Sequence, residues 1–248
     1  MRVCFFKMKY LLVAVLLIAV MSAGKEAVNV FMSGGRNIPV YSVETDDNKV
    51  ALTFNCAWNA DDIDEILKLL EKYNAKCTFF IVGQWAEKYP DKVEKIYKSG
   101  HEIGEHSYNH KDYTKLSGAE ITNDIKKTAD VLKEITGEWP GLVRVPSGAY
   151  NNTAVSVIEK NGYTPVQWSV DSIDYDKNSG CEDIFRRATS KTHAGDIILM
   201  HNGTENTAVA LPRILDSLCG RFELVTVSEL IPDGNFVVDN AGEVKRVE

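Results

Sequence analysis

Three features are missing from this 248-residue sequence, and each absence excludes a class of protein. There is no excess of basic residues: 28 Lys and Arg against 35 Asp and Glu give a net charge of −7, which argues against a nucleic-acid-binding surface. The five cysteines form no dense framework of the small-domain type, although a Cys181–Cys219 bridge is one open pairing. No glycine-rich phosphate loop follows the first predicted strand, so a Rossmann-type nucleotide site is not expected.

The composition, 44% hydrophobic and 25% charged, is that of a globular domain, but residues 1–24 differ in kind. Basic residues precede the apolar run Tyr10–Val20, and small residues follow it. This pattern predicts a secretory signal peptide, cleaved between Ala23 and Ala27. The alternative is an uncleaved membrane anchor, for which the run is short of the ~20 residues that span a bilayer. Either outcome places the protein outside the cell, secreted or on the outer face of the membrane or wall, with membrane contact only through an uncleaved N-terminus.

After this segment, residues 25–48 predict a lead-in arm in which Ile38–Val43 forms an edge strand. Short apolar runs then alternate with amphipathic stretches. The apolar runs predict strands at Lys49–Phe54, Lys76–Gly83, His101–His106, Leu142–Val145, Thr164–Val170, Asp196–His201 and Glu223–Val225. The amphipathic stretches predict helices at Asp61–Tyr73, Tyr89–Ser99, Ser117–Thr136, Asn152–Asn161, Cys181–Thr189 and Asn206–Cys219. Repeated βα units imply parallel strands with helices outside, so residues 49–231 are expected to form an α/β domain, as an open sheet or a barrel, before a C-terminal tail at 232–248.

A barrel carries its chemistry at the C-terminal ends of its strands. The predicted strand ends are rich in groups that bind metals or transfer protons: Asn55, Cys56, His106, His110, Arg144, Pro146, Asp171, Asp174 and His201. Within this set, His106 and His110 are four residues apart and can converge on one ion. Imidazole suits zinc and similar divalent metals, so the pair is a candidate for two of the three protein ligands of a catalytic metal site.

Five short motifs make the chain resemble the polysaccharide deacetylases, the NodB-homology domain of carbohydrate esterase family four. They lie between residues 49 and 231, in the family's order. Thr53–Cys56 is similar to the motif T-F-D-D, His106–His110 matches H-[ST]-x-x-H, Arg144–Tyr150 is similar to R-x-P-x-G, Asp171–Tyr175 is similar to D-x-x-D-W, and Leu199–His201 matches L-x-H. The lead-in arm and the Cys-Ala-Trp variant of the first motif look most like the sporulation-type deacetylases of spore-forming bacteria.

The resemblance implies a single-domain distorted (β/α) barrel with about seven parallel strands, acting as a monomer. It implies a divalent metal, zinc before cobalt, and removal of N-acetyl groups from cell-wall glycan or a chitin-like polysaccharide. By the same resemblance, His106 and His110 would be metal ligands and His201 would protonate the leaving amine. Asp174 would orient His201, and Arg144 would hold the catalytic base of the first motif. These groups supply what amide hydrolysis needs: an activated water, a stabilised oxyanion and a proton for nitrogen.

Two positions depart from the family pattern. The first motif's aspartates, which supply the base and the third metal ligand, are here Asn55 and Cys56. An amide cannot accept a proton at neutral pH, so the base is missing. Cys56 is either a thiolate ligand or a small apolar residue behind the site. Asp61 or Asp62 is a candidate replacement ligand or base, against the alternative that both serve the helix start.

The residues expected to bind substrate are Trp58, Pro146, Tyr150, Tyr175 and Leu199. Their aromatic members predict a sugar-stacking cleft, against the alternative of simple packing at the barrel rim. Two functions therefore follow from the sequence. The first is a metal-dependent N-deacetylase, and the second is a catalytically impaired relative that binds glycan.

Overall fold

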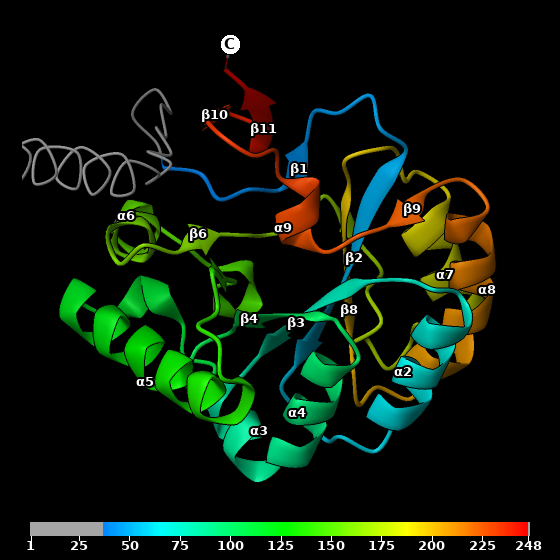
Figure 1. The fold of residues 1–248 in the computed structure, drawn as a ribbon, viewed down its shortest axis with the longest axis horizontal. Coiled ribbons are helices and arrows are strands. Elements are labelled where there is room, and N and C mark those ends of the chain that lie inside the picture. The colour runs from blue at the N-terminus through cyan, green and yellow to red at the C-terminus, as the bar shows by residue number, and fades with distance from the viewer. Residues whose placement is uncertain (1–36, 248) are drawn as a thin grey trace, which may run out of the picture.

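The computed structural model describes residues 37–247, so the predicted signal segment at 1–24 lies outside the described residues. Strand β2 (Lys49–Cys56) stands at the centre of a curled sheet (Figure 1). The strand order is β6-β5-β4-β3-β2-β8-β7, with β9 also pairing with β2, and every pairing along it is parallel. The other strands are β3 (Cys77–Ile81), β4 (Glu102–Glu105), β5 (Leu142–Val143), β6 (Thr164–Pro165), β7 (Val170–Asp171), β8 (Ile197–His201) and β9 (Glu223–Leu224). The prediction of a single α/β domain with a distorted barrel of about seven parallel strands is thereby confirmed, with seven strands along the main order and β9 beside β2.

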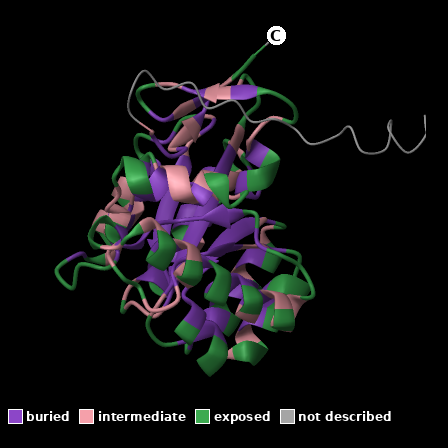
Figure 2. Cartoon of the chain, turned by 90° about the vertical axis from the view of Figure 1, so that its left-hand side faces the viewer, coloured by how far each residue is buried: buried purple, intermediate pink, exposed green. Residues whose placement is uncertain are grey.

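Helices cover the outside of this sheet, as the βα alternation predicts (Figure 1). They are α2 (Ile63–Lys72), α3 (Gly83–Lys88), α4 (Pro90–Lys98), α5 (Gly118–Thr136), α6 (Asn152–Lys160), α7 (Cys181–Thr189), α8 (Thr207–Cys219) and the short α9 (Val227–Leu230). Figure 2 shows buried residues concentrated in the strands and exposed ones on the outer faces of the helices. Helix α2, for example, buries Ile63, Ile66 and Leu70 completely, and each such side chain contributes about 1.5–3 kcal/mol. Within residues 37–247, no helix has the length and apolar character needed to cross a bilayer.

The predicted strand Thr164–Val170 is wrong in one respect, because it forms two strands at opposite edges of the sheet. β6 pairs with β5 at one edge, and β7 pairs with β8 at the other. The backbone N–H of Val166 still donates to the carbonyl of Val143 at 2.9 Å, but that of Gln167 donates to the carbonyl of Val40 at 2.7 Å. The chain therefore turns from β5 to the lead-in arm, where Val40 bridges Val166, and crosses toward the other edge. The barrel is distorted because its two edge strands, β6 and β7, are joined by the connecting chain segment and do not pair with each other by hydrogen bonds.

The predicted arm and tail lie together as a second, three-stranded sheet. β1 (Ser42–Val43) is an edge strand parallel to β11 (Glu243–Arg246), which is antiparallel to β10 (Phe236–Val238). The edge-strand prediction for the arm is correct at Ser42–Val43. The C-terminal segment is therefore more than a tail, because its apolar residues Phe236, Val238 and Val244 are buried.

The Cys181–Cys219 pairing does not occur. All four described cysteines are free. The Cys181 thiol lies 3.5 Å from Asn206, at the beginning of α8, whereas Cys219 is the last residue of that helix. At 1.5 Å per residue the helix is roughly 20 Å long, far beyond the ~4.4–6.8 Å between the Cα atoms of a disulfide.

Candidate active site

Four predicted residues lie at the C-terminal ends of parallel strands of the same sheet. Asn55 and His201 are paired in register between β2 and β8. His106 follows β4, and Arg144 follows the neighbouring β5. The backbone N–H of Arg144 bonds the carbonyl of Glu105 at 2.9 Å, which fixes these two strand ends relative to each other. Residues distant in sequence are thus brought together by parallel strand register, as expected at this edge of a barrel.

The two motif histidines form a close, desolvated pair. The rings of His106 and His110 are 5.0 Å apart between centroids and nearly perpendicular. Nδ1 of His106 lies 2.7 Å from the carbonyl oxygen of Arg144. A neutral His106 ring donates its Nδ1–H to that carbonyl, which leaves the lone pair of Nε2 free for a ligand. Burial, and then the neighbouring His110, lower the pKa of His106, so both the tautomer and the charge state suit metal binding.

The loop that carries this histidine pair has an energetically unfavourable backbone conformation. Ser107 and His110 have positive φ angles of 67° and 58°, which non-glycine residues rarely adopt. Asp124 of α5 compensates, since its carboxylate accepts the backbone N–H of Tyr108 at 2.8 Å and the hydroxyl of Tyr113 at 2.9 Å. Asp124 is a positioning residue that the sequence analysis missed, because its only sequence signal is an acidic residue inside an amphipathic helix.

His201 is oriented by a buried carboxylate. Nδ1 of His201 lies 2.8 Å from Oδ1 of Asp174, and the backbone N–H of His201 donates to Oδ2 at 2.7 Å. The hydroxyl of Thr207, in the first turn of α8, also donates to Oδ2 at 2.6 Å. Three donors therefore fix the carboxylate, which in turn holds the imidazole with Nε2 pointing away from Asp174. This is the arrangement of a general acid whose tautomer is set by a carboxylate.

Arg144 is fully buried and forms no salt bridge with any residue between 37 and 247. Its guanidinium donates to Oγ1 of Thr53 at 2.8 Å, to Oδ1 of Asn55 at 3.0 Å and to the carbonyl of Gln167 at 2.9 Å. It also lies 3.9 Å from the centroid of the Phe80 ring. Burial lowers the pKa of Arg144, and Asp171 opposes that shift. The residue is placed to hold a carboxylate at position 55, where the chain has an amide.

Cys56 does not join the histidine pair. Successive side chains of a strand point to opposite faces, so Cys56 leaves the Asn55 face of β2 and packs, fully buried, in the core cluster under the helices. Burial and the charge of Asp62 raise the pKa of the Cys56 thiol, which disfavours a thiolate. Across residues 37–247, no three His, Cys, Asp or Glu side chains converge as a metal-binding group. His106 and His110 therefore fit two ligand positions of a divalent metal, whereas Cys56 does not fit the third.

The predicted replacement acids are not at the histidine pair either. Asp62 accepts the backbone N–H of Gly203 at 2.8 Å and the side-chain amide of Asn202 at 3.4 Å. Burial raises the pKa of Asp62. Its carboxylate thus ties the loop after β8 to the start of α2, and Asp61 is exposed beside it. Asp62 is a loop-positioning residue in this geometry.

Two of the predicted substrate residues form an exposed aromatic bracket around His201. Trp58 and Tyr175, each 48% exposed, lie 5.2 and 5.4 Å from the imidazole between ring centroids. Leu199 is buried and, two residues before His201 on β8, lies on the same face of the strand.

The other two predicted substrate residues have different surroundings. Pro146 is buried in a 3-10 turn. The Tyr150 hydroxyl contacts that of Tyr41 in the lead-in arm at 3.3 Å.

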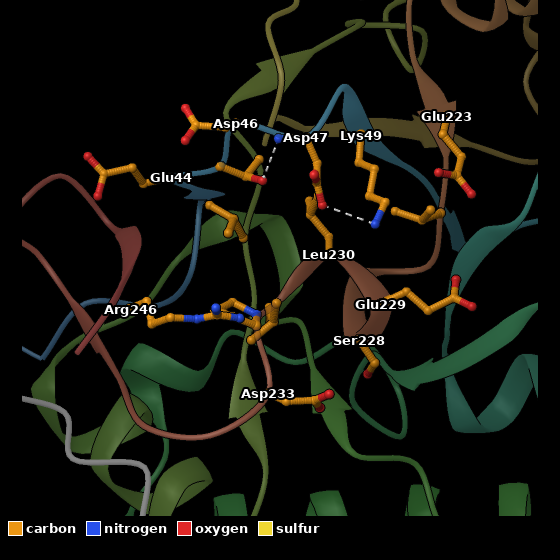
Figure 3. Close-up of a pocket in the computed structure, with 15 residues that line it drawn as sticks. Glu44, Asp46, Asp47, Lys49, Glu223, Ser228, Glu229, Leu230, Asp233 and Arg246 are labelled. Carbon is orange, nitrogen blue, oxygen red and sulfur yellow. Dashed lines mark hydrogen bonds and ion pairs between the residues drawn. The ribbon is translucent and has the colours of Figure 1, made fainter. Parts of the chain in front are cut away.

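A cavity of about 1000 Å³ lies elsewhere. Residues of β9, α9, the three-stranded sheet and the N-terminal end of β2 line it (Figure 3). Its lining includes Glu44, Asp46, Asp233 and the Asp47–Lys49 ion pair at 3.2 Å. It contains none of the predicted site residues, so cavity size does not locate the chemistry in this molecule.

The fold and the site define a hydrolase-type (β/α) barrel with paired histidines, a carboxylate-oriented histidine and a buried arginine at the strand ends. A family model described as polysaccharide deacetylase matches residues 42–166. The chain is 34% identical over 196 residues to the uncharacterized protein YlxY of Bacillus subtilis, covering 79% of this chain and 61% of YlxY. It is 32% identical over 197 residues to a peptidoglycan-N-acetylglucosamine deacetylase of Bacillus cereus, covering 77% of this chain and 92% of that protein. The chain belongs to the polysaccharide deacetylase family.

Solved structures show the same relationship. BA3943 of Bacillus anthracis, described as a CE4 family pseudoenzyme, aligns with a TM-score of 0.75 at 28% identity, over 80% of this chain and 70% of that one. A BA3943 mutant described as having restored enzymatic activity aligns with the same TM-score and identity. Similar proteins thus carry the names of enzymes and of a pseudoenzyme, and the catalytic state of this chain depends on its own residues.

Proposed function

We propose that this protein binds acetylated cell-wall glycan through a deacetylase cleft whose hydrolytic step lacks its base. One observation carries the proposal: Asn55 occupies the base position and accepts a hydrogen bond from Arg144 at 3.0 Å. Oδ1 of an amide is a hydrogen-bond acceptor and has no useful basicity at neutral pH. A positioned general base is worth roughly 10²–10⁴-fold in rate, so the loss at this one position is large.

The cleft keeps the features that would bind an acetylated sugar. Trp58 and Tyr175 offer exposed aromatic faces, while His201 between them presents a hydrogen-bonding ring. His201 and Asp174 still form the pair that would hold and deliver a proton to the amide nitrogen. A divalent metal, zinc before cobalt, would supply polarisation of the acetyl carbonyl and of water. Among residues 37–247, His106 and His110 are the pair that would hold it. We further propose export by the N-terminal segment and action outside the cell as a monomer.

A second candidate, an active N-deacetylase that uses a different proton acceptor, is favoured by the intact His201–Asp174 pair and by the half-buried Asp62 close to the loop after β8. This candidate requires the Asp62 side chain to leave Gly203 and swing toward the site. The two candidates differ in one measurable respect, the activity of the unaltered sequence.

The test compares acetate release from N-acetylated peptidoglycan and chitooligosaccharides, with zinc or cobalt added. The proteins are the unaltered chain and Asn55→Asp. Asn48→Asp is the matched control, since it adds the same charge at an exposed asparagine. The proposal predicts glycan binding without acetate release by the unaltered chain and by Asn48→Asp, and acetate release only by Asn55→Asp.

Equal activity of the unaltered chain and Asn55→Asp would establish the second candidate, which Asp62→Asn should then abolish. Absence of glycan binding by the unaltered chain would refute the proposal.

A further inference from the structure

In the part of the chain that the structure describes, exposed large aromatic side chains gather at two places. Trp58 and Tyr175 bracket His201, and they belong to the candidate active site. Trp139 and Tyr97, which are 57% and 37% exposed, lie together on the lining of another cavity of about 170 Å³. Exposed large aromatics that share a cavity are more informative than scattered ones, which are normal on any surface.

This second cavity lies at the opposite end of the barrel strands from the histidine pair. Tyr97 is in the last turn of α4, and Trp139 is in the loop between α5 and β5. Glu102, also in the lining, is the first residue of β4, whereas His106 follows its last residue. Four strand residues at about 3.3 Å each separate the two ends by roughly 13 Å. The cavity is therefore a different place from the cleft of the proposed function.

The lining pairs flat aromatic surface with hydrogen-bonding groups. Glu138, beside Trp139, is exposed at the rim. The carboxylate of Glu102 is held by Thr78 and Ser228, so it forms a fixed wall. The ammonium of Lys133 lies 5.9 Å from the Trp139 ring centroid, which leaves most of this exposed ring open to solvent.

A buried and unpartnered imidazole completes the lining. His101 is only 5% exposed, and its Nδ1 has no hydrogen-bond partner among the residues that the structure describes. Buried polar atoms of this kind are normally paired. The group is neutral, in keeping with a pKa lowered to about 4 by burial and by Lys76. A neutral imidazole can bond a hydroxyl group, directly or through a bridging water, at no electrostatic cost.

We propose that this cavity is a second saccharide-binding site, which takes one pyranose unit of a β-linked N-acetylated glycan. A pyranose ring has an apolar C–H face, which packs on the electron-rich face of an indole, and an edge of hydroxyls, which needs acceptors and donors. Trp139 and Tyr97 provide the stacking surface, and Glu138 and His101 provide the polar contacts. The small volume holds a single ring and leaves no room for a folded peptide.

Two sites on one chain would act together on a polymer. Once one site is bound, the other meets the glycan at high effective concentration, which raises overall affinity for a polymer by up to roughly 10²–10⁴-fold without a new contact. A short oligosaccharide that fills one site gains nothing from the second. The second site thus predicts a preference for long or insoluble glycan over short oligosaccharides.

The experiment uses the full chain with N-acetylchitotetraose and insoluble chitin as probes. The chain has four tryptophans, so its indole N–H signals can be assigned in ¹⁵N NMR spectra with Trp58→Phe and Trp139→Phe. We expect tetrasaccharide to shift both signals, with two separate affinities. Trp139→Ala should weaken retention on chitin at least tenfold and leave the Trp58 titration unchanged. Trp139→Phe, which keeps a stacking ring, should restore most of the retention.

The outcomes separate this inference from the proposed function. A Trp139 signal that stays unmoved when the Trp58 signal is saturated overturns the second site and leaves the proposed function standing. A shift of Trp139 with no shift of Trp58 supports the second site and refutes glycan binding in the cleft. No shift at either tryptophan, with no retention on chitin, refutes both. Because Trp139 is exposed, its substitution should leave the melting temperature within a few degrees of the unaltered value, which serves as the folding control.

Discussion

Replacing Asn55 with Asp should create a buried ion pair with Arg144 whose effect on stability depends on pH. Nη1 of Arg144 already lies 3.0 Å from Oδ1 of Asn55, so a carboxylate oxygen would take the same position. At an effective dielectric constant of ~20, unit charges ~4 Å apart attract by about 4 kcal/mol. Moving the carboxylate out of water costs several kcal/mol. The two effects nearly cancel, so the net change in the free energy of unfolding at pH 7 should be within about 2 kcal/mol.

The sign of the pH dependence distinguishes pairing from desolvation. If the positive charge of Arg144 dominates, the folded-state pKa of the introduced carboxyl group falls below its unfolded value of about 3.9. The stabilisation from the pair is then fully present above that value and is lost as the pH falls through the folded pKa. A folded pKa about two pH units below the unfolded one would correspond to about 2.7 kcal/mol. The variant should therefore lose more stability than the unaltered protein between about pH 5 and pH 2.

Urea unfolding at pH values between 2 and 7 measures this difference, with Asn48→Asp as the control for an added exposed carboxylate. The control should show a much smaller slope, because residue 48 is exposed. If Asn55→Asp instead gains stability relative to the unaltered protein as the pH falls from 7 to 4, its carboxyl pKa is raised. In that case desolvation outweighs Arg144, and the assignment of Arg144 as the holder of a base is wrong.

Three further outcomes test individual contacts. Burial and Lys76 lower the pKa of His101 to about 4, so its neutral form stabilises the fold above pH 6.5 and this contribution is lost as the pH falls toward 4. His101→Gln should remove up to about 3 kcal/mol of that pH dependence in urea unfolding. Thr207→Val should cost about 1–3 kcal/mol in thermal unfolding, because it removes the 2.6 Å hydrogen bond to buried Asp174, and Thr207→Ser should recover most of it. Cys56 should react with thiol reagents only as fast as the protein unfolds, and zinc affinity measured by calorimetry should be equal for Cys56→Ala and the unaltered chain.

The sequence predicted elements well where local chemistry decides them. Helix α5 begins within the predicted range 117–136, where Ser117 and Glu120 form a capping box, and helix α7 occupies the predicted range 181–189. The strand at 164–170 failed because its apolar run has no signal for a change of sheet edge, which depends on the tertiary contact of Val166 with Val40. The arm and the tail are separated by nearly the whole domain, so local patterns could not show that they pair.

In the candidate site, too, some features could be predicted from the sequence and others depend on tertiary contacts. Parallel register brought His106, Arg144 and His201 together as their strand-end positions predicted. The motif left open whether Cys56 is a metal ligand or a core residue. The alternation of side chains along β2 places Cys56 in the core, which argues against a ligand role. Asp124 and Thr207 could not be found from sequence, because each acts through one hydrogen-bond geometry and neither belongs to a motif.

The asparagine at position 55 affects the stability of the barrel because it bonds the buried guanidinium of Arg144. A fully buried guanidinium without a carboxylate would be expected to destabilise a fold by several kcal/mol. Here three neutral oxygens and the face of Phe80 take the place of the missing charge. The amide of Asn55 supplies one of those oxygens, so this residue cannot be removed without leaving a buried donor unpaired. Asn55→Ala should therefore destabilise the protein more than Asn55→Asp at pH 7, although both lack the native amide, because only the aspartate gives Arg144 an acceptor.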